Sequence, residues 1–135
     1  MITVVDDHLV LELLLGRSIA VDGAVTTTVH WWWRLAAAMR RRAGGALSGP
    51  SLALASAERA ALIATIDELG TLLEIADTRE VLPVAADLAA AHRLNLLAAE
   101  ALAVCVVDEA DLAVGVDNPP LARAAEALGI TYAVV

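Results

Sequence analysis

The chain has 135 residues, a length that predicts one domain and excludes two domains of ordinary size. Apolar residues make up 59% of it, all nine basic residues are arginine, and seventeen carboxylates bring the formal net charge to −8. The lack of lysine excludes lysine-dependent chemistry. A chain this acidic repels nucleic acid unless a local basic patch or bound cations offset its charge.

Charged residues interrupt every long apolar stretch, so we expect no membrane-spanning helix. The first residues, MITVVDDHLV, have no basic region and are not expected to form a signal peptide, and we therefore expect a cytoplasmic protein. The single cysteine, Cys105, lies in the apolar run AVCVV, which predicts a buried side chain rather than a reactive thiol.

The N-terminal part of the chain begins with a predicted strand and helix. The β-branched run ITVVD (2–6) predicts a buried strand, and the leucine-rich segment 6–15, which stops at a glycine, predicts a helix. We expect a loop with little regular structure over 17–29, because the segment contains the turn residues VDGA. A second helix is predicted from about 28 to 42, closed by the glycine pair 44–45.

The middle of the chain predicts a connection, a helix and an edge strand. Residues 43–55 are rich in Gly, Ser, Ala and Pro, which is typical of a surface connection. The helix expected from about 57 to 69 has Ser56 as its N-cap and Gly70 at its end. We interpret REVLPV (79–84) as a short edge strand, because its proline cannot donate a hydrogen bond to a neighbouring strand.

In the last third of the chain, we expect two helices or one bent helix over AADLAAAHRLN (85–95) and LLAAEALAVCVV (96–107). We then expect a strand over DLAVGV (111–116), a helix over PPLARAAEAL (119–128) and a final strand over ITYAVV (130–135). We expect the helix break near Asn95, an N-cap at Asn118 and a helix end at Gly129. Strands that alternate with helices predict an α/β domain whose parallel sheet is covered on both faces.

Acidic residues stand where two of the predicted strands end. Asp6 follows the first strand, and Asp117 follows the strand before the last. Ligands of open parallel sheets bind beyond the carboxyl ends of the strands, and oxygen ligands gathered there favour Mg²⁺ or Mn²⁺. Glu100, seventeen residues before Asp117, supplies a third acid. In the alternative interpretation Asp6 or Asp7 only caps the first helix, and Asp117 only helps to cap the last.

Two segments resemble the PIN-domain nucleases found among bacterial VapC-type toxins. AAEALAVCVVDEADLAVGVDNPPLARAAEALGI (98–130) is similar to the end of that family, where a helix opening on Asp-Ala-Leu precedes a strand that closes on Asp and a Leu-Ala-Arg-Ala helix. VVDDHLVLELLLG (4–16) is similar to the family's first strand, first acid and leucine-rich helix. The resemblance implies one PIN-like domain over 1–135, a three-layer α/β/α sandwich with a central, mainly parallel sheet of four or five strands.

The resemblance implies three acids that are both catalytic and metal-binding: Asp6, Glu100 and Asp117. The family has Asp at the position of Glu100, which is a conservative departure. At the place of the family's remaining acid this sequence has Arg34 or one of its tryptophan neighbours, and arginine cannot ligate a cation. Asp7 or Asp111 is available as a substitute. If Arg34 points into the cleft, we expect its charge to neutralise one carboxylate.

The implied function is a Mg²⁺- or Mn²⁺-dependent endoribonuclease of the VapC toxin type, with RNA as substrate and an antitoxin protein as partner. Because one acid is missing, we expect the remaining three carboxylates to hold one metal weakly instead of forming the two-metal clamp for phosphodiester hydrolysis. The alternative is a catalytically weak or inactive PIN-like protein that serves as a dimerisation or partner-binding module. The string VVDDH also suggests the receiver domain of a response regulator. We reject that family because it needs a lysine near its end.

Three adjacent tryptophans, Trp31, Trp32 and Trp33, span about 200° of a helix and cannot all face one core. At least one is expected to be partly exposed, either because the helix is buried on two sides or because the exposed part forms an interface. We expect a homodimer that uses this apolar surface. The run Arg40-Arg41-Arg42 is either a solvated helix end or a local basic patch. The three histidines lack the spacing of a zinc site and are interpreted as structural or surface residues.

Overall fold

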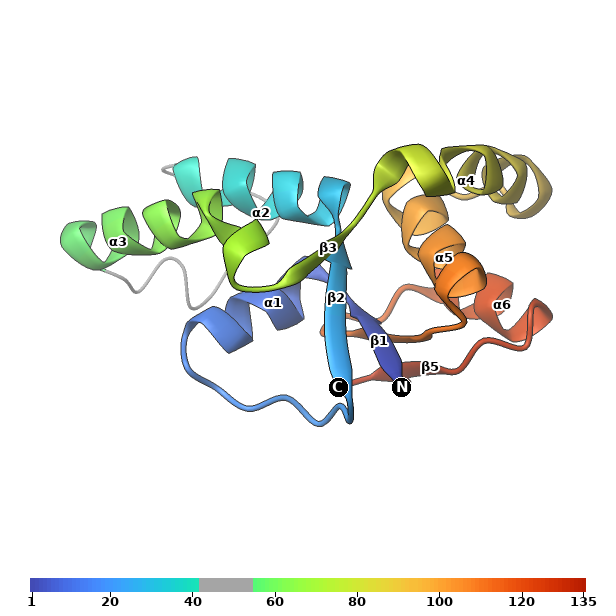
Figure 1. Cartoon of the computed structure of the whole chain (residues 1–135), viewed down its shortest axis with the longest axis horizontal. Helices are drawn as coiled ribbons and strands as arrows, with labels where there is room; N and C mark the ends of the chain where they lie inside the picture. The colour runs from blue at the N-terminus through green and yellow to red at the C-terminus, as the bar shows by residue number, and fades with distance from the viewer. Residues whose placement is uncertain (42–54) are drawn as a thin grey trace.

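The computed structural model describes residues 1–41 and 55–135. Within them the chain forms a five-stranded sheet and six α-helices, and Figure 1 shows the sheet between two groups of helices. The predicted connection over 43–55 lies outside the described residues except at Ala55, and so do Arg42 and the glycine pair 44–45.

The sheet consists of parallel strands in the order β3-β2-β1-β4-β5. The strands are β1 (Ile2–Val5), β2 (Ala24–Thr28), β3 (Glu74–Ala76), β4 (Asp111–Val114) and β5 (Tyr132–Val134). The chain winds outward from β1 to β3 and then returns to the other side of β1, where it forms β4 and β5. The direction of winding therefore changes between β1 and β4, and this is the point where open α/β sheets bind ligands.

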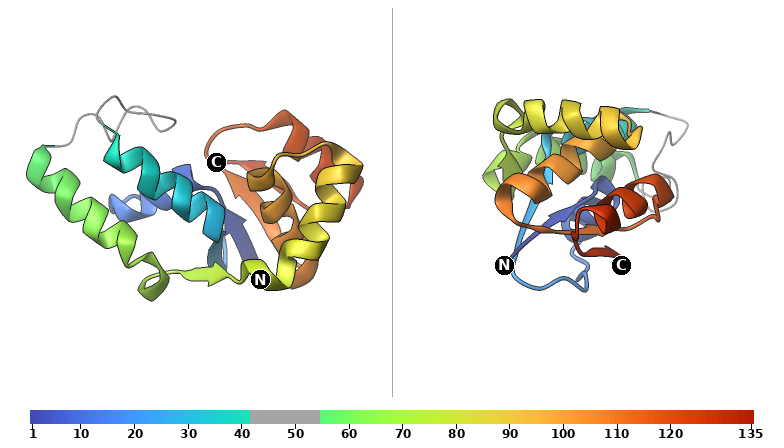
Figure 2. Two further views of the ribbon diagram at one scale, coloured as in Figure 1. Left: turned by 90° about the horizontal axis from the view of Figure 1, so that it is seen from above. Right: turned by 90° about the vertical axis from the view of Figure 1, so that its right-hand side faces the viewer.

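The helices form two layers, one on each face of the sheet (Figure 2). Their bounds are α1 (Asp7–Leu14), α2 (Val29–Arg40), α3 (Ser56–Asp67), α4 (Thr78–His92), α5 (Leu96–Asp108) and α6 (Pro119–Ala127), and a short 3₁₀ helix, η1, covers Leu69–Thr71. Val5 and Ala113 share a core with α1, α2 and α3, whereas Val4 and Leu112 share the other core with α4, α5 and α6. Since alternate strand residues point to opposite faces, these contacts confirm the three-layer α/β/α sandwich.

Strand β2 lies inside the segment that we expected to be a loop, so that prediction is wrong over Ala24–Thr28. Three threonines at its end are buried because each hydroxyl finds a partner. Thr27 donates to the carbonyl oxygen of Val5 at 2.8 Å, Thr26 donates to that of Glu74 at 2.9 Å, and Thr28 accepts from the N–H of Trp31 as the N-cap of α2. Because these hydroxyl groups are hydrogen-bonded, their burial in the sheet avoids the free-energy cost of burying an unpaired polar group.

The predicted edge strand over 79–84 is also wrong, because these residues belong to α4. One edge strand of the sheet, β3, lies a few residues earlier and has only three residues. Asp77 caps α4 by accepting from the N–H of Arg79. The helix tolerates Pro83 because Val81, Ala85 and Leu88 bury one of its faces in the core.

The chain bends between α4 and α5, as expected, and the two are separate helices that meet at 118°. Arg93 adopts a left-handed conformation at the break, and Asn95 caps α5 by accepting from the N–H of Ala98. Ser56 is not the N-cap that we expected for α3, because it is the first helical residue and Ala55 precedes it. None of the helices described here is by itself long and apolar enough to cross a membrane, although α4 and α5 together meet the criteria of length and composition.

Helix α2 is buried on two sides, which explains how two of its three adjacent tryptophans contact different hydrophobic cores. Trp31 is 4% exposed in the core below α4, α5 and α6, and Trp32 packs against the other core and donates its indole N–H to the carbonyl oxygen of Ile66 at 2.7 Å. Trp33 is 62% exposed. The expectation that at least one of the three is exposed is confirmed.

Replacing Pro83 by alanine is expected to stabilise the protein, because a proline in the body of α4 leaves the carbonyl of Arg79 without its helical N–H donor. Helix propensities put the gain in free energy of unfolding at about 1–3 kcal/mol, measured by urea denaturation. Pro120→Ala is the control, since Pro120 lies in the first turn of α6, where no helical hydrogen bond is lost. A lower stability of Pro83→Ala would contradict this explanation.

Candidate functional site

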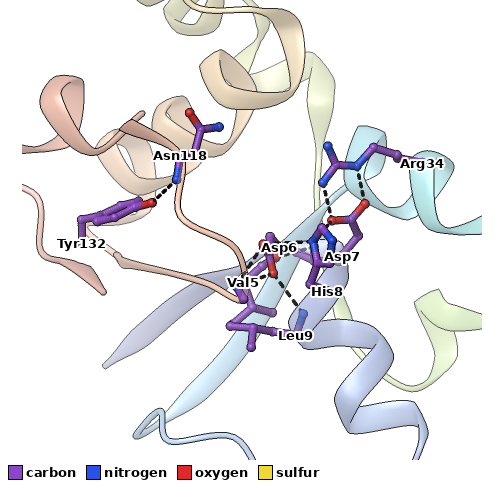
Figure 3. A network of polar contacts seen from close by, with 10 residues as sticks. Val5, Asp6, Asp7, His8, Leu9, Arg34, Asn118 and Tyr132 are labelled. Atoms are coloured by element: carbon purple, nitrogen blue, oxygen red, sulfur yellow. Dashed lines mark hydrogen bonds and ion pairs between the residues drawn. The ribbon is translucent and has the colours of Figure 1, made fainter. Parts of the chain in front are cut away.

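A cavity of about 240 Å³ lies beyond the carboxyl ends of β1 and β4, where the sheet changes its direction of winding. Its polar lining residues are Asp6, His8, Arg34, Asn95, Asp117 and Asn118. Trp31 and several aliphatic side chains complete the wall. Figure 3 shows that most of the charged groups come from the end of β1, the first turn of α1 and the facing side of α2.

Asp6 is the residue after β1, and its carboxylate is held by backbone N–H groups from two elements. It accepts from the N–H of Leu9 at 3.0 Å and so caps α1, as the capping interpretation predicts. The N–H of Gly115 lies 3.0 and 3.1 Å from its two oxygens, which joins the end of β1 to the end of β4. Asp6 is 3% exposed, so these donors replace most of its contact with water.

Asp7 is the first residue of α1, and its side chain is fully buried. Arg34 of α2 donates two N–H groups to this carboxylate. Nε contacts one carboxylate oxygen, and Nη2 contacts the other at 2.5 Å (Figure 3). Burial by itself raises the pKa of Asp7, but the hydrogen bonds and charges of Arg34 and His8 outweigh it and hold that pKa below its ordinary value. Asp7 is therefore a buried, ionised carboxylate with a fixed cationic partner.

His8 lies between the two carboxylates. Its Nδ1 is 3.2 Å from an oxygen of Asp7 and 3.5 Å from an oxygen of Asp6, and it forms no hydrogen bond of good geometry with either. Contacts with Asp6 and then Asp7 raise the pKa of His8 from 6.5 to about 9, so the imidazole is protonated at neutral pH.

The three acids that were predicted as metal ligands are placed differently. Asp6 and Asp117 both line the cavity, and Asp117 is exposed and accepts a hydrogen bond from the hydroxyl of Tyr132 at 3.0 Å. Glu100 is 1% exposed on α5 and is absent from the cavity lining; its carboxylate contacts the ring and the backbone N–H of His30 at the start of α2. Glu100 thus connects α5 to α2.

Among the described residues, one group of three could offer ligand atoms to a metal ion, with these atoms all within 4.8 Å of one another. It consists of Asp6, Asp7 and His8. Asp6, Glu100 and Asp117 do not form such a group, and their joint role as metal ligands stays a prediction. The group that does form fits a divalent cation poorly. Two carboxylates, Asp6 and Asp7, are matched by two cations, His8 and Arg34, so a bound metal would meet positive charges at the same oxygens.

Sequence reasoning anticipated part of this site. Arg34 lines the cavity, so the condition set for it is met, and the carboxylate that its charge neutralises is that of Asp7. The role of His8 was missed, although its position directly after two acids is a usable signal. Gly115 was missed as well: a Cβ at this position would lie 2.8 Å from Cβ of His8, so only glycine lets the end of β4 approach α1 this closely.

Comparison with known proteins does not extend these observations, because no protein-family model and no curated protein matches the chain. The resemblance to PIN-domain nucleases therefore stays a prediction.

Gly115→Ala is expected to lower the free energy of unfolding by about 1–3 kcal/mol, because the added methyl group forces β4 away from His8 and weakens the contact with Asp6. Gly70→Ala is the matched control, since the nearest atom to its Cβ would be Cγ1 of Ile75 at 3.9 Å. Urea denaturation of both variants measures the difference. Equal stability of Gly115→Ala and wild type would contradict the proposed tight approach.

The raised pKa of His8 predicts a stability that depends on pH. Because the folded state holds this proton more tightly than the unfolded state, the stabilisation is complete below pH 6.5 and is lost as pH rises through about 9. Between pH 6.5 and about 9, we expect the free energy of unfolding of wild type to fall by about 2 kcal/mol more than that of His8→Gln. This value is reduced because the His8 side chain is partly exposed. Urea denaturation across the pH range, with NMR titration of the imidazole, measures both. An imidazole that titrates near 6.5 would refute the ion cluster.

Proposed function

We propose that this protein is a PIN-like domain that works as a dimerisation or partner-binding module and not as a metal-dependent nuclease. The observation that carries the proposal is the two-pronged contact between Arg34 and Asp7. In the family that the sequence resembles, acids gathered at this edge of the sheet hold a divalent cation. Here a guanidinium group from the chain itself pairs with Asp7, the fully buried carboxylate next to Asp6, and thereby brings a positive charge to this place.

The charge balance of the site supports this proposal. Two cationic groups, the protonated imidazole of His8 and the guanidinium of Arg34, lie against the carboxylates of Asp6 and Asp7. Mg²⁺ and Mn²⁺ bind sites in which anionic oxygens dominate. A divalent ion placed at Asp6 and Asp7 would have to displace Arg34 or be repelled by it, and its binding free energy would be reduced accordingly.

Protonation of His8 also disfavours the binding of a metal ion. An imidazolium has no free lone pair for a metal, so a cation that used His8 would first have to remove its proton. Because the pKa of His8 is about 9, this exchange is unfavourable by about two powers of ten at pH 7. A metal that avoids His8 still encounters its charge next to both carboxylates.

The second candidate is a Mg²⁺- or Mn²⁺-dependent endoribonuclease of the VapC type, with an antitoxin as its partner. One observation favours it: Asp6 and Asp117 line the same cavity at the ends of neighbouring parallel strands. On this hypothesis Asp6 and Asp117 would bind the ion, and Glu100 would have to leave His30 to join them.

Mn²⁺ titration by calorimetry, together with an RNA cleavage assay, separates the two candidates. We expect wild type to show no saturable Mn²⁺ binding in the micromolar range and no Mn²⁺-dependent cleavage. Arg34→Glu removes the competing cation and supplies a carboxylate, so it should bind Mn²⁺ at least about tenfold more tightly than wild type, equivalent to ~1.4 kcal/mol. Arg17→Glu has the same change of charge at an exposed position of the loop after α1 and serves as the control.

Two results would overturn the proposal. One is Mn²⁺-dependent RNA cleavage by wild type that is lost in Asp6→Asn, which would establish the nuclease. The other is equal or weaker Mn²⁺ binding by a folded Arg34→Glu variant, with folding verified by circular dichroism. That result would mean that Arg34 does not keep a cation from this site.

A further inference from the structure

We propose that the cavity at the end of β1 binds a small organic carboxylate with an apolar body. The cavity volume of about 240 Å³ equals that of about eight water molecules at ~30 Å³ each, so it suits a ligand of about that many non-hydrogen atoms. Residues with free hydrogen-bond donors and residues with aliphatic side chains line it together. The inference rests on the part of the proposed function that assigns no metal ion to this place.

Arg34 brings a fixed positive charge to the cavity wall and keeps part of its hydrogen-bonding capacity. Asp7 accepts from its Nε and Nη2, whereas Nη1 donates to none of the described residues. Figure 3 shows this third nitrogen turned away from Asp7. Because a guanidinium group has five N–H groups, those that Asp7 leaves free can hold a second carboxylate.

The indole N–H of Trp31 is a second free donor, and it belongs to a side chain that is almost entirely buried. Trp31 is 4% exposed and lines the cavity. Its N–H has no hydrogen-bond partner within the described part of the chain, whereas the indole of Trp32 donates to Ile66. The indole nitrogen of Trp31 is not among the described unpartnered atoms that are fully closed off from solvent, so a ligand can reach it. An acceptor oxygen inside the cavity would give this N–H the partner that buried tryptophans usually have.

Two asparagines supply amide donors at the cavity wall. Asn95 and Asn118 cap α5 and α6 with their side-chain oxygens, which accept from the N–H of Ala98 and of Leu121. The NH₂ group of each side chain lies on the other branch of the amide and donates to none of the residues described. Figure 3 shows Asn118 and Arg34 on opposite sides of the end of β1, so a ligand between them would meet donors from both sides.

The acceptors at the cavity offer less to a ligand than the donors do. Asp6 already accepts from the backbone N–H groups of Leu9 and Gly115. Asp117 is exposed and accepts from the hydroxyl of Tyr132. The free hydrogen-bonding groups of the wall are therefore mainly donors, and this favours an anion over a cation.

The start of α6 favours a carboxylate over a phosphate. Helix N-termini bind phosphate through free backbone N–H groups, but α6 begins with Pro119 and Pro120, which have none. A carboxylate has one charge and two oxygens, so it needs fewer donors and is repelled less by the nearby carboxylate of Asp117. The side chains of Val114 and Val116 can then cover an apolar body.

NMR titration of the ¹⁵N-labelled full chain with isovalerate and with benzoate, in the presence of EDTA, tests the proposal. We expect saturable binding with a dissociation constant on the order of 0.1–1 mM and shifts of the amide signals of Leu97 and Val116, which line the cavity. Isovaleramide lacks the charge and acetate lacks the branched body, so each should bind at least about tenfold more weakly than isovalerate. No saturable binding of either acid up to about 10 mM, or equal binding of isovaleramide, would overturn the proposal.

Asn95→Asp and Asn118→Asp test the donors without removing a helix cap. Aspartate caps a helix as well as asparagine does, but each variant replaces an amide donor by a negative charge at the cavity. We expect isovalerate to bind each at least about tenfold more weakly. Ser56→Asp adds the same charge at the exposed first residue of α3, outside the cavity lining, and should stay within about twofold of wild type. With folding verified by urea denaturation, unchanged binding by both asparagine variants would overturn the proposal.

Metal dependence separates this inference from the proposed function. The isovalerate titration is therefore repeated with Mn²⁺ in place of EDTA. We expect the same affinity in both. If isovalerate binds under neither condition, the inference is wrong and the proposed function stands. If isovalerate binds only after Mn²⁺ is added, a metal ion holds the anion, and both are wrong.

Discussion

The structure of the candidate site depends on one buried charge. Asp7 begins α1 directly below the end of β1 and has no contact with water, so it must either lose its charge or receive a positive partner. Arg34 supplies that partner from α2, and His8 adds a second positive charge from the next position. The lowered pKa of Asp7 follows from this requirement, and Asp7 contributes, after Asp6, to the raised pKa of His8.

The sheet topology explains why these groups meet. Because β4 returns to the side of β1 opposite to β2, the chain after β4 passes over the first turn of α1. Gly115 gives this segment the close approach that lets its N–H reach Asp6, and Asp117 then enters the wall of the same cavity. The fold thus provides the place where α/β proteins bind ligands, and the side chains there include a buried carboxylate, Asp7, that Arg34 of the same chain neutralises.

Much of this was predictable from local patterns. The alternation of strands and helices indicated the sandwich. The position of Asp6 after a β-branched run indicated both its role as the N-cap of α1 and its place at the carboxyl end of β1. The errors arose where long-range contacts override local preference. Buried hydroxyl hydrogen bonds keep Thr27 in a strand, and core packing keeps Pro83 in a helix. The pairing of Glu100 with His30 joins residues seventy positions apart, and no local pattern identifies it.

Asp7 and Arg34 form one electrostatic unit, and we propose that this unit takes the place of a bound cation. A double-mutant cycle on the free energy of unfolding, with Asp7→Asn, Arg34→Gln and the double variant, tests it most directly. We predict a coupling free energy of about 2 kcal/mol or more, because Arg34→Gln leaves the fully buried carboxylate of Asp7 without its cationic partner. Additivity within about 0.5 kcal/mol would contradict the claim, since it would mean that Asp7 does not depend on Arg34 for its charge.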